Sequence, residues 1–178
     1  IYTKLSGGSL PIRELTSIPR KVMESELVKS KLGNKISYHE LQELTNILSN
    51  DKRYDFSYGI FVTIENNKIL RGCIGQFTDS NQLDRLITEL TLKSAFFDSR
   101  FYDNMITINE LSELSYKINF ISPPITIYNH SEKDIYQTVK DNLIIGKHGI
   151  TLYFDNNSSS TYLANVLIEA FDIKEINE

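Results

Sequence analysis

Apolar residues recur every three or four positions in two segments of the chain, residues 37–50 and 83–97. This spacing is typical of amphipathic helices that bury one face. The first segment opens with Ser37 and Glu40, which have the spacing of a capping box. Both segments are therefore predicted to be helices, and residues 83–97 carry the clearer pattern.

A different pattern, rich in β-branched and aromatic residues, begins at Tyr58 in the stretch YGIFVTIENNKILRGCIG. Asn66 and Asn67 interrupt it, and asparagine tolerates the positive φ angles of a tight turn. The stretch therefore predicts an antiparallel hairpin whose second strand ends in LRGCIG. Polar and apolar residues alternate in SYKINFIS before Pro123, which predicts a further, half-buried strand.

The two ends of the chain have weaker patterns. SGGS, Pro11 and Pro19 predict that residues 1–35 form an irregular lead or arm. Toward the other end, EKDIYQTVKDN predicts a helix. LIIGKHGITLYF contains two short apolar runs joined by GKHG, which predict either a pair of strands or one bulged strand. The polar stretch DNNSSST predicts a loop that leads into a last helix at about residues 161–171.

Helices mixed with strands that neighbour one another in sequence predict an α+β fold, with a mostly antiparallel or mixed sheet flanked by helices. At 178 residues the chain has the length of one globular domain. We therefore expect an irregular lead at residues 1–35 and one α+β domain at residues 36–178.

Composition narrows the class of protein further. The chain has 19 basic and 23 acidic residues, a formal net charge of -4, and its basic residues are scattered. Since proteins that track phosphates need a basic stripe, nucleic-acid binding is disfavoured. No apolar run has the length of a membrane span, and the first residues lack the pattern of a secretory signal. We therefore expect a soluble, cytoplasmic protein without membrane contact.

The chain has one cysteine and three histidines, so it has no internal disulfide, and no cluster has the spacing of a zinc site. We expect no structural metal and no cofactor. Half of the eight glycines fall in two short motifs, RGCIG and GKHG. Two glycines at the end of a strand expose N–H groups and place one side chain, here Cys73, at a bend.

Two interpretations of Cys73 are open. A free cysteine on a strand is most often a small buried hydrophobe. The alternative is a reactive thiolate, which nearby cations such as Arg71, Lys147 or a protonated His148 would favour. His148 is likewise either a proton-transfer group or a turn residue that bonds the backbone.

Asp98 and Arg100, in the stretch FFDSRF, follow the end of the second predicted helix. They form either a charge-assisted pair that fixes the helix exit or a site for an anionic ligand. The structural role is favoured because helix ends commonly use such pairs.

The chain contains four stretches, in this order: YGIFVTIENNKILRGCIG, KSAFFDSRF, ISPP and GKHGITL. In their order and spacing, these stretches closely resemble the AMMECR-type domain family, over residues 58–166. LRGCIG is the most specific signature of that family. The resemblance implies an α+β fold of two unequal lobes whose signature lines a cleft or an exposed surface. It also implies an association with a Memo-type protein and a radical SAM enzyme, and it leaves the reaction open.

Three functions follow, in order of preference. The first is a binding or adaptor module whose LRGCIG surface docks a small anion, a peptide or a partner protein. The second is a thiol-dependent or redox enzyme component in a system with the Memo-type protein and the radical SAM enzyme. The third is a nucleic-acid-associated factor. The candidate catalytic residues are Cys73 and His148, and the candidate ligand-binding residues are Arg71, Gly72, Ile74, Gly75, Lys147, Asp98 and Arg100.

Overall fold

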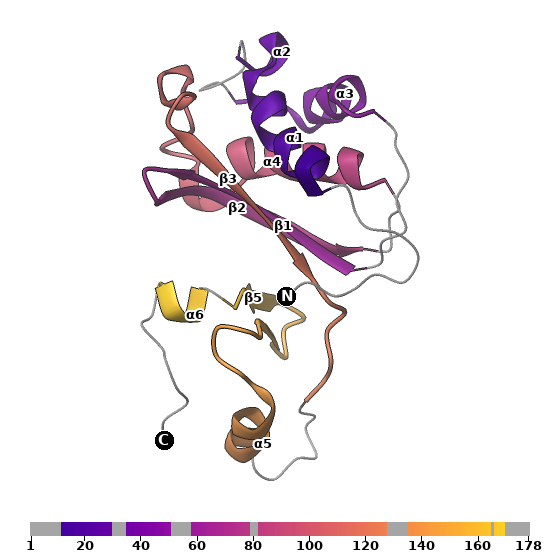
Figure 1. Cartoon of the computed structure of the whole chain (residues 1–178), viewed down its shortest axis with the longest axis vertical. Coiled ribbons are helices and arrows are strands. Elements are labelled where there is room, and N and C mark those ends of the chain that lie inside the picture. The colour runs from indigo at the N-terminus through magenta and orange to yellow at the C-terminus, as the bar shows by residue number, and fades with distance from the viewer. Residues whose placement is uncertain are drawn as a thin grey trace. The chain divides into compact units, whose positions relative to one another are not determined.

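The computed structural model of the chain (Figure 1) describes residues 12–29, 35–50, 58–78, 82–127, 135–164 and 166–169. The chain divides into two compact units, with the boundary between Pro123 and Pro124. Helices and antiparallel strands alternate irregularly along the chain, so the predicted α+β class is confirmed.

The first unit is built on a three-stranded antiparallel sheet with the order β2-β1-β3. These strands span Tyr58–Asn66 (β1), Ile69–Thr78 (β2) and Leu114–Ile121 (β3). Asn67 and Lys68 form the turn between β1 and β2, and both have a positive φ, 49° and 68°. A two-residue hairpin turn requires this backbone. The predicted hairpin and third strand are confirmed, and the turn lies one position later than the sequence indicated.

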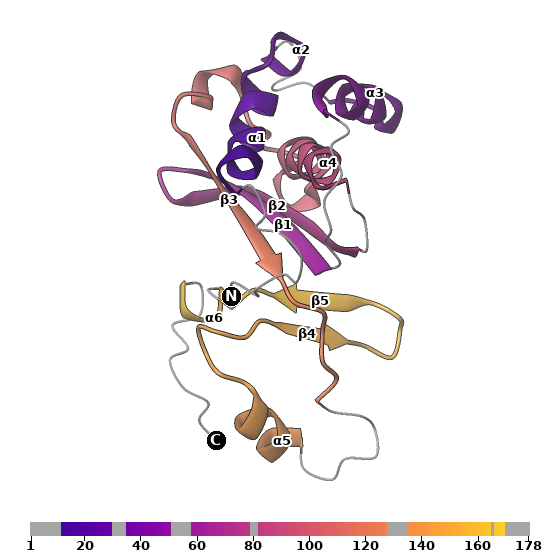
Figure 2. The same ribbon diagram turned by 45° about the vertical axis from the view of Figure 1, so that its right-hand side comes forward.

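Helices of the first unit cover one face of this sheet, as Figures 1 and 2 both show. The two that pack on the strands are α1 and α4, and α3 packs on α4. Helix α3 begins with the predicted capping box of Ser37 and Glu40. The helical elements are α1 (Ile12–Glu24), α2 (Glu26–Lys29), α3 (Tyr38–Leu48), α4 (Leu83–Phe96), and the 3-10 turns η1 (Ser99–Phe101) and η2 (Ile108–Glu110).

The core lies between the sheet and these helices. Ile60, Val62 and Ile64 of β1 are fully buried there together with leucines of α4. Because side chains alternate along a strand, Phe61 and Thr63 point to the opposite face of the sheet. That second face is the one on which the thiol of the signature lies.

The lead predicted at residues 1–35 is wrong over its described part, because α1 and α2 are helical. Pro19 lies inside α1, where a proline removes one backbone hydrogen bond. The apolar side chains of Leu15, Val22 and Met23 are buried, and α1 contacts both α4 and β3. Burial of this face therefore outweighs the helix-breaking tendency of the proline.

The second unit contains α5 (Ile135–Asn142), a two-stranded antiparallel hairpin of β4 (Ile150–Tyr153) and β5 (Ser159–Tyr162), and α6 (Val166–Glu169). The helix predicted in EKDIYQTVKDN is present as α5. GKHG does not join two strands, because β4 pairs instead with a strand inside the polar stretch DNNSSST. Asn157, at a φ of 60°, occupies the turn between them. The last helix begins at Val166 rather than near residue 161, since that segment is taken by β5.

No helix in the described segments of either unit is long and apolar enough to cross a membrane.

Candidate functional site

Strand β2 forms an edge of the sheet and places Cys73 on the face opposite the helices. Cys73 lies across from Thr63 of β1 in the hairpin register. The Thr63 hydroxyl oxygen and the Cys73 sulfur are 3.2 Å apart, a hydrogen-bonding distance for a thiol. The cysteine is only partly buried, so its thiol is neither a core group nor a fully exposed one.

The peptide groups of Cys73 are held by the loop that follows α4. Asp98 accepts a hydrogen bond from the Cys73 N–H at 2.9 Å, and Arg100 Nη2 donates to the Cys73 carbonyl at 3.1 Å. The two side chains are joined by a short ion pair, with Arg100 Nη2 2.6 Å from Asp98 Oδ2. Together they bond the N–H and the carbonyl of Cys73 at the edge of β2, as a neighbouring strand would. The charge-assisted pair predicted at the helix exit is therefore present, and it also fixes the cysteine.

Burial and charge differ sharply between the members of this pair. The Asp98 side chain is 4% exposed, whereas that of Arg100 is 56% exposed. Burial alone would raise the pKa of Asp98, but hydrogen bonds from Arg100 and from the Cys73 N–H hold it below its ordinary value. The same contact with Asp98 raises the pKa of Arg100. The buried Asp98 carboxylate thus fixes the position of the charged Arg100 guanidinium through an ion pair.

The glycines of the signature allow close approach between elements. A Cβ on Gly72 would collide with the Ser94 carbonyl of α4, and one on Gly75 would collide with the ring of Phe61. Neither glycine has a positive φ, so packing and not backbone conformation requires them. Gly72 lets the helix end reach the strand that carries the cysteine.

Ser94 uses this proximity to bridge the two strands. Its hydroxyl oxygen accepts the Ile74 N–H at 2.9 Å and donates to the Val62 carbonyl at 2.9 Å. The N–H groups of Cys73 and Ile74 are therefore both bonded inside the protein. The expectation that this stretch exposes backbone donors to a ligand is wrong at these two positions, because Asp98 and Ser94 already accept from them.

Arg71 has a different environment from the one expected. Its guanidinium is buried and binds Glu110 through two hydrogen bonds, of 2.8 and 3.1 Å, and the Met105 carbonyl at 3.3 Å. Burial would raise the pKa of Glu110, but hydrogen bonds from Arg71, the Thr107 N–H and other donors lower it overall. The cation that interacts with Cys73 is therefore Arg100 and not Arg71.

Lys147 and His148 belong to the second unit, where the GKHG motif forms the turn after α5. The His148 Nδ1 lies 3.2 Å from the Ile144 N–H and 3.0 Å from the Asn142 carbonyl. Gly146, at a φ of 79°, supplies the backbone that the turn requires. The ring thus bonds the backbone of its own turn, and a role for His148 or the exposed Lys147 in catalysis or binding stays a prediction.

The structure brings together three residues that were candidates, Cys73, Asp98 and Arg100, and adds two that were missed, Thr63 and Ser94. Counting across the hairpin from the predicted turn at Asn66 and Asn67 would have placed Ile60 and not Thr63 beside Cys73, because the turn lies one position later and the register shifts at a bulge. No comparable signal exists for Ser94, because its contact depends on how α4 packs. Among the described residues, no three histidine, cysteine or acidic side chains gather in a way that would hold a metal ion.

The fold and this site define an α+β protein whose edge strand carries the LRGCIG signature. The loop after α4 holds this strand through hydrogen bonds of Asp98 and Arg100 to Cys73. The sequence profile of the AMMECR1 family matches residues 17–175, and the chain belongs to that family. It is 29% identical over 141 residues to the protein Mbar_A1807 of Methanosarcina barkeri, covering 78% of this chain and 61% of that protein. It is 32% identical over 183 residues to the uncharacterized protein YOR289W of Saccharomyces cerevisiae, covering 98% and 65%.

The chain therefore spans less than two thirds of the length of these two relatives. The crystal structure of the uncharacterized protein PH0010 from Pyrococcus horikoshii matches the fold with a TM-score of 0.62 at 23% identity. That match covers 89% of this chain and 71% of the other. It supports the α+β architecture described above.

Proposed function

We propose that the first unit is a binding module that recognises an anionic group of a ligand or partner protein on the surface formed by Cys73 and Arg100, with the buried Thr63 beside the thiol, called here the Cys73 surface. One observation carries this proposal. The Arg100 side chain is 56% exposed, yet its guanidinium is held by hydrogen bonds to Asp98 and to the Cys73 carbonyl.

A guanidinium held in this way is suited to binding. A free arginine loses side-chain entropy when it orders around a ligand, whereas Arg100 is already held by its bonds to Asp98 and Cys73. Its Nε and Nη2 donate to Asp98, and Nη2 also donates to Cys73, whereas Nη1 has no hydrogen-bond acceptor among the described residues. The Nη1 donors are left for a carboxylate or phosphate oxygen. Because Asp98 offsets the charge, attraction at a distance is weak and recognition depends on contact geometry.

The test is a titration with inorganic phosphate and, separately, with acetate, followed by amide and arginine side-chain NMR signals. We expect shifts that concentrate on Cys73 and on the Arg100 Nε–H. Arg100→Gln should abolish them, and Arg100→Lys should weaken them because lysine lacks the planar fork. Arg13→Gln removes an exposed cation on α1, over the opposite face of the sheet, and serves as the matched control. Unshifted signals in the wild-type protein would contradict an anion-recognising surface.

A second candidate, a thiol-dependent enzyme component, is favoured by the contacts of the sulfur. The Cys73 thiol is partly exposed and lies 3.2 Å from the Thr63 hydroxyl, and the Arg100 guanidinium bonds the Cys73 carbonyl. The discriminating measurement is the rate of alkylation of native Cys73 by iodoacetamide against pH. Slower alkylation in Arg100→Gln, with Thr63→Val as a second probe, would support this candidate. A thiol that reacts only after unfolding would reject it.

The partner proteins stay proposals as well. A Memo-type protein or a radical SAM enzyme, or a peptide of either, would bring a carboxylate or phosphate group to the Cys73 surface. Binding of such a partner should be lost in Arg100→Gln and kept in Arg13→Gln. A nucleic-acid partner is less favoured, because the chain has a net charge of -4. Retention on a polyanion resin at physiological salt would support such a partner.

A further inference from the structure

Strand β2 continues beyond Cys73 on the face of the sheet that is opposite to the helices. Every second side chain of a strand points to the same side, so Cys73 is followed on this face by Gly75 and then by Phe77. The hairpin register has no shift in this part, and Phe61 of β1 lies opposite Gly75. The face therefore changes from a polar end at Cys73 to an aromatic end at Phe77.

Two phenylalanine rings form the aromatic end. The ring of Phe61 lies over Gly75, because a Cβ built on Gly75 would collide with that ring. The ring of Phe77 stands edge-on to it, with 6.4 Å between the ring centroids and 83° between the ring planes. Phe77 is 40% exposed, and Phe61 and Gly75 are partly exposed. These three residues are called here the aromatic platform.

Arg100 lies at the polar end of this face. Its guanidinium donates to the Cys73 carbonyl at 3.1 Å, and its side chain is 56% exposed. Gly75 is two residues further along β2, a distance of about 7 Å at the rise of an antiparallel strand. The positions of β3 beside the platform hold Asn119 and Ile121, neither of which is charged. A cation and an uncharged aromatic surface thus lie within the length of one small molecule.

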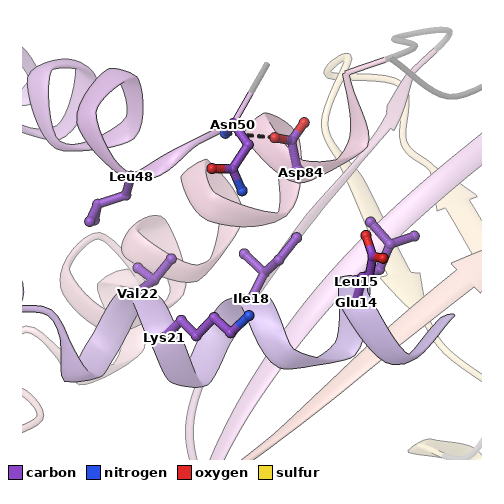
Figure 3. Close-up of a pocket in the computed structure, with 8 residues that line it drawn as sticks. All are labelled: Glu14, Leu15, Ile18, Lys21, Val22, Leu48, Asn50 and Asp84. Carbon is purple, nitrogen blue, oxygen red and sulfur yellow. Dashed lines mark hydrogen bonds between the residues drawn. The ribbon is translucent and has the colours of Figure 1, made fainter. Parts of the chain in front are cut away.

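The other face of the sheet is covered by helices (Figure 2). Figure 3 shows a cavity among these helices, lined by residues of α1, α3 and α4. Leu15, Val22 and Asp84 on its wall are at most 2% exposed. The Asp84 carboxylate already accepts the Asn50 N–H at 2.7 Å, the dashed line in Figure 3. That cavity therefore lies among packed helices, whereas the ring of Phe77 is open to solvent.

We propose that the ligand of the Cys73 surface is a small aromatic anion, an aryl-alkyl carboxylate whose carboxylate binds the Nη1 donors of Arg100 and whose ring packs on the aromatic platform. The proposal rests on the proposed function, since it uses the same guanidinium. Aromatic rings that meet edge-to-face or with an offset stabilise one another beyond the apolar area that they bury. Gly75 leaves the space in which the Phe61 ring lies flat enough over β2 to form this surface.

The experiment is a titration of the full chain with 3-phenylpropanoate, followed by the backbone amide signals of Cys73, Gly75 and Phe77 and by the Arg100 Nε–H signal. Three matched probes each change one feature: propanoate lacks the ring, 3-cyclohexylpropanoate has a saturated ring, and 3-phenylpropanol lacks the charge. We expect 3-phenylpropanoate to bind at least about tenfold more tightly than propanoate and the alcohol. The cyclohexyl compound should bind more weakly than the phenyl compound, and nuclear Overhauser effects should connect the ligand ring to Phe77.

A pair of variants separates the platform from the rest of the protein. Phe77→Leu removes a partly exposed ring and keeps an apolar side chain, so it should reduce the affinity for 3-phenylpropanoate to that for propanoate. Tyr38→Leu removes an exposed ring at the start of α3, in the helical layer, and should leave the affinity unchanged.

The outcomes distinguish this inference from the proposed function. If propanoate and 3-phenylpropanoate shift the Arg100 Nε–H signal with equal affinity, the aromatic platform is overturned and anion recognition by Arg100 stands. If 3-phenylpropanoate binding survives Phe77→Leu, or if the alcohol binds as tightly as the carboxylate, the inference is likewise overturned. If neither carboxylate shifts the Arg100 signal, the inference and the proposed function both fail.

Discussion

The Asp98 carboxylate accepts the backbone N–H of Cys73 at 2.9 Å, across 25 positions of sequence. The same carboxylate accepts from the Arg100 backbone and from its guanidinium. One buried side chain therefore organises both the helix exit and the edge strand that carries the signature. Its removal should affect stability and the Cys73 surface together.

Asp98→Asn should lower the free energy of unfolding by about 2–3 kcal/mol, because charge-assisted hydrogen bonds to a buried group are lost. Urea denaturation at neutral pH measures this loss. Asp103→Asn, a substitution of an exposed acid a few residues later, should change the free energy by less than about 0.5 kcal/mol. A similar loss in both variants would contradict the role of Asp98.

Acid should destabilise the protein through the same residue. The pKa of Asp98 is lower in the folded protein than its ordinary value of 3.8, and that of Glu110 is lower than 4.5. Their contribution to stability is therefore complete above those ordinary values and is lost as pH falls through the lower, folded-state pKa values. Denaturant midpoints measured from pH 7 to pH 2 should show the difference between wild type and Asp98→Asn shrinking below about pH 4.

Gly72→Ala should destabilise the protein by about 3 kcal/mol or more, because the new methyl group collides with the Ser94 carbonyl and pushes α4 from the sheet. Gln76→Ala, at an exposed position of the same strand, is the control. Thermal unfolding of the two variants compares them directly. A Gly72→Ala protein with unchanged stability would show that the helix and strand do not meet this closely.

The ion pair of Arg71 and Glu110 should contribute more to the free energy of unfolding than an exposed ion pair does. Arg71→Leu leaves the carboxylate of Glu110 without its bidentate partner and should cost about 3 kcal/mol. The double variant with Glu110→Leu should cost less than the sum of the two single variants, which a double-mutant cycle measures. The exposed pair of Arg20 and Glu24 on α1 should couple by less than about 1 kcal/mol. Equal coupling energies in the two cycles would contradict this prediction.

Alkaline pH should destabilise the protein through Tyr116. Burial raises the pKa of Tyr116 to about 12, and its hydroxyl has no hydrogen-bond partner among the described residues. A raised pKa contributes stability that is complete below pH 10 and is lost as pH rises toward 12. Tyr116→Phe should therefore match the wild type at pH 7 and exceed it by about 1–2 kcal/mol at pH 12, after allowance for solvent screening. Equal losses in the two proteins on alkaline titration would contradict the assignment.

The helices and strands with strong periodicity were predictable from the sequence. The capping box at Ser37 and the leucines of α4 are local signals, and both helices formed as predicted. Helix α1 was missed because Pro19 suggested an irregular segment, whereas packing of Leu15 and Met23 decides the outcome. Propensity is a weak guide wherever tertiary burial is complete.

The candidate site was predictable only in part, for a related reason. Cys73 and Arg71 stand out within six residues, but their partners lie 25 and 39 positions away. Which cation approaches the cysteine depends on the course of the chain after α4 and on the hairpin bulge between Ile64 and Glu65. A single sequence shows which residues have reactive or charged side chains, but which of them are in contact depends on the tertiary structure.

The Ser94 bridge has a consequence for the opening of the protein. The Ile74 amide is bonded to a helix side chain, so its hydrogen exchanges with solvent deuterium only when α4 separates from the hairpin. Separation of α4 from the hairpin is therefore expected to limit exchange at this amide. The exchange rate of this single amide thus reports the free energy with which α4 is docked on the sheet.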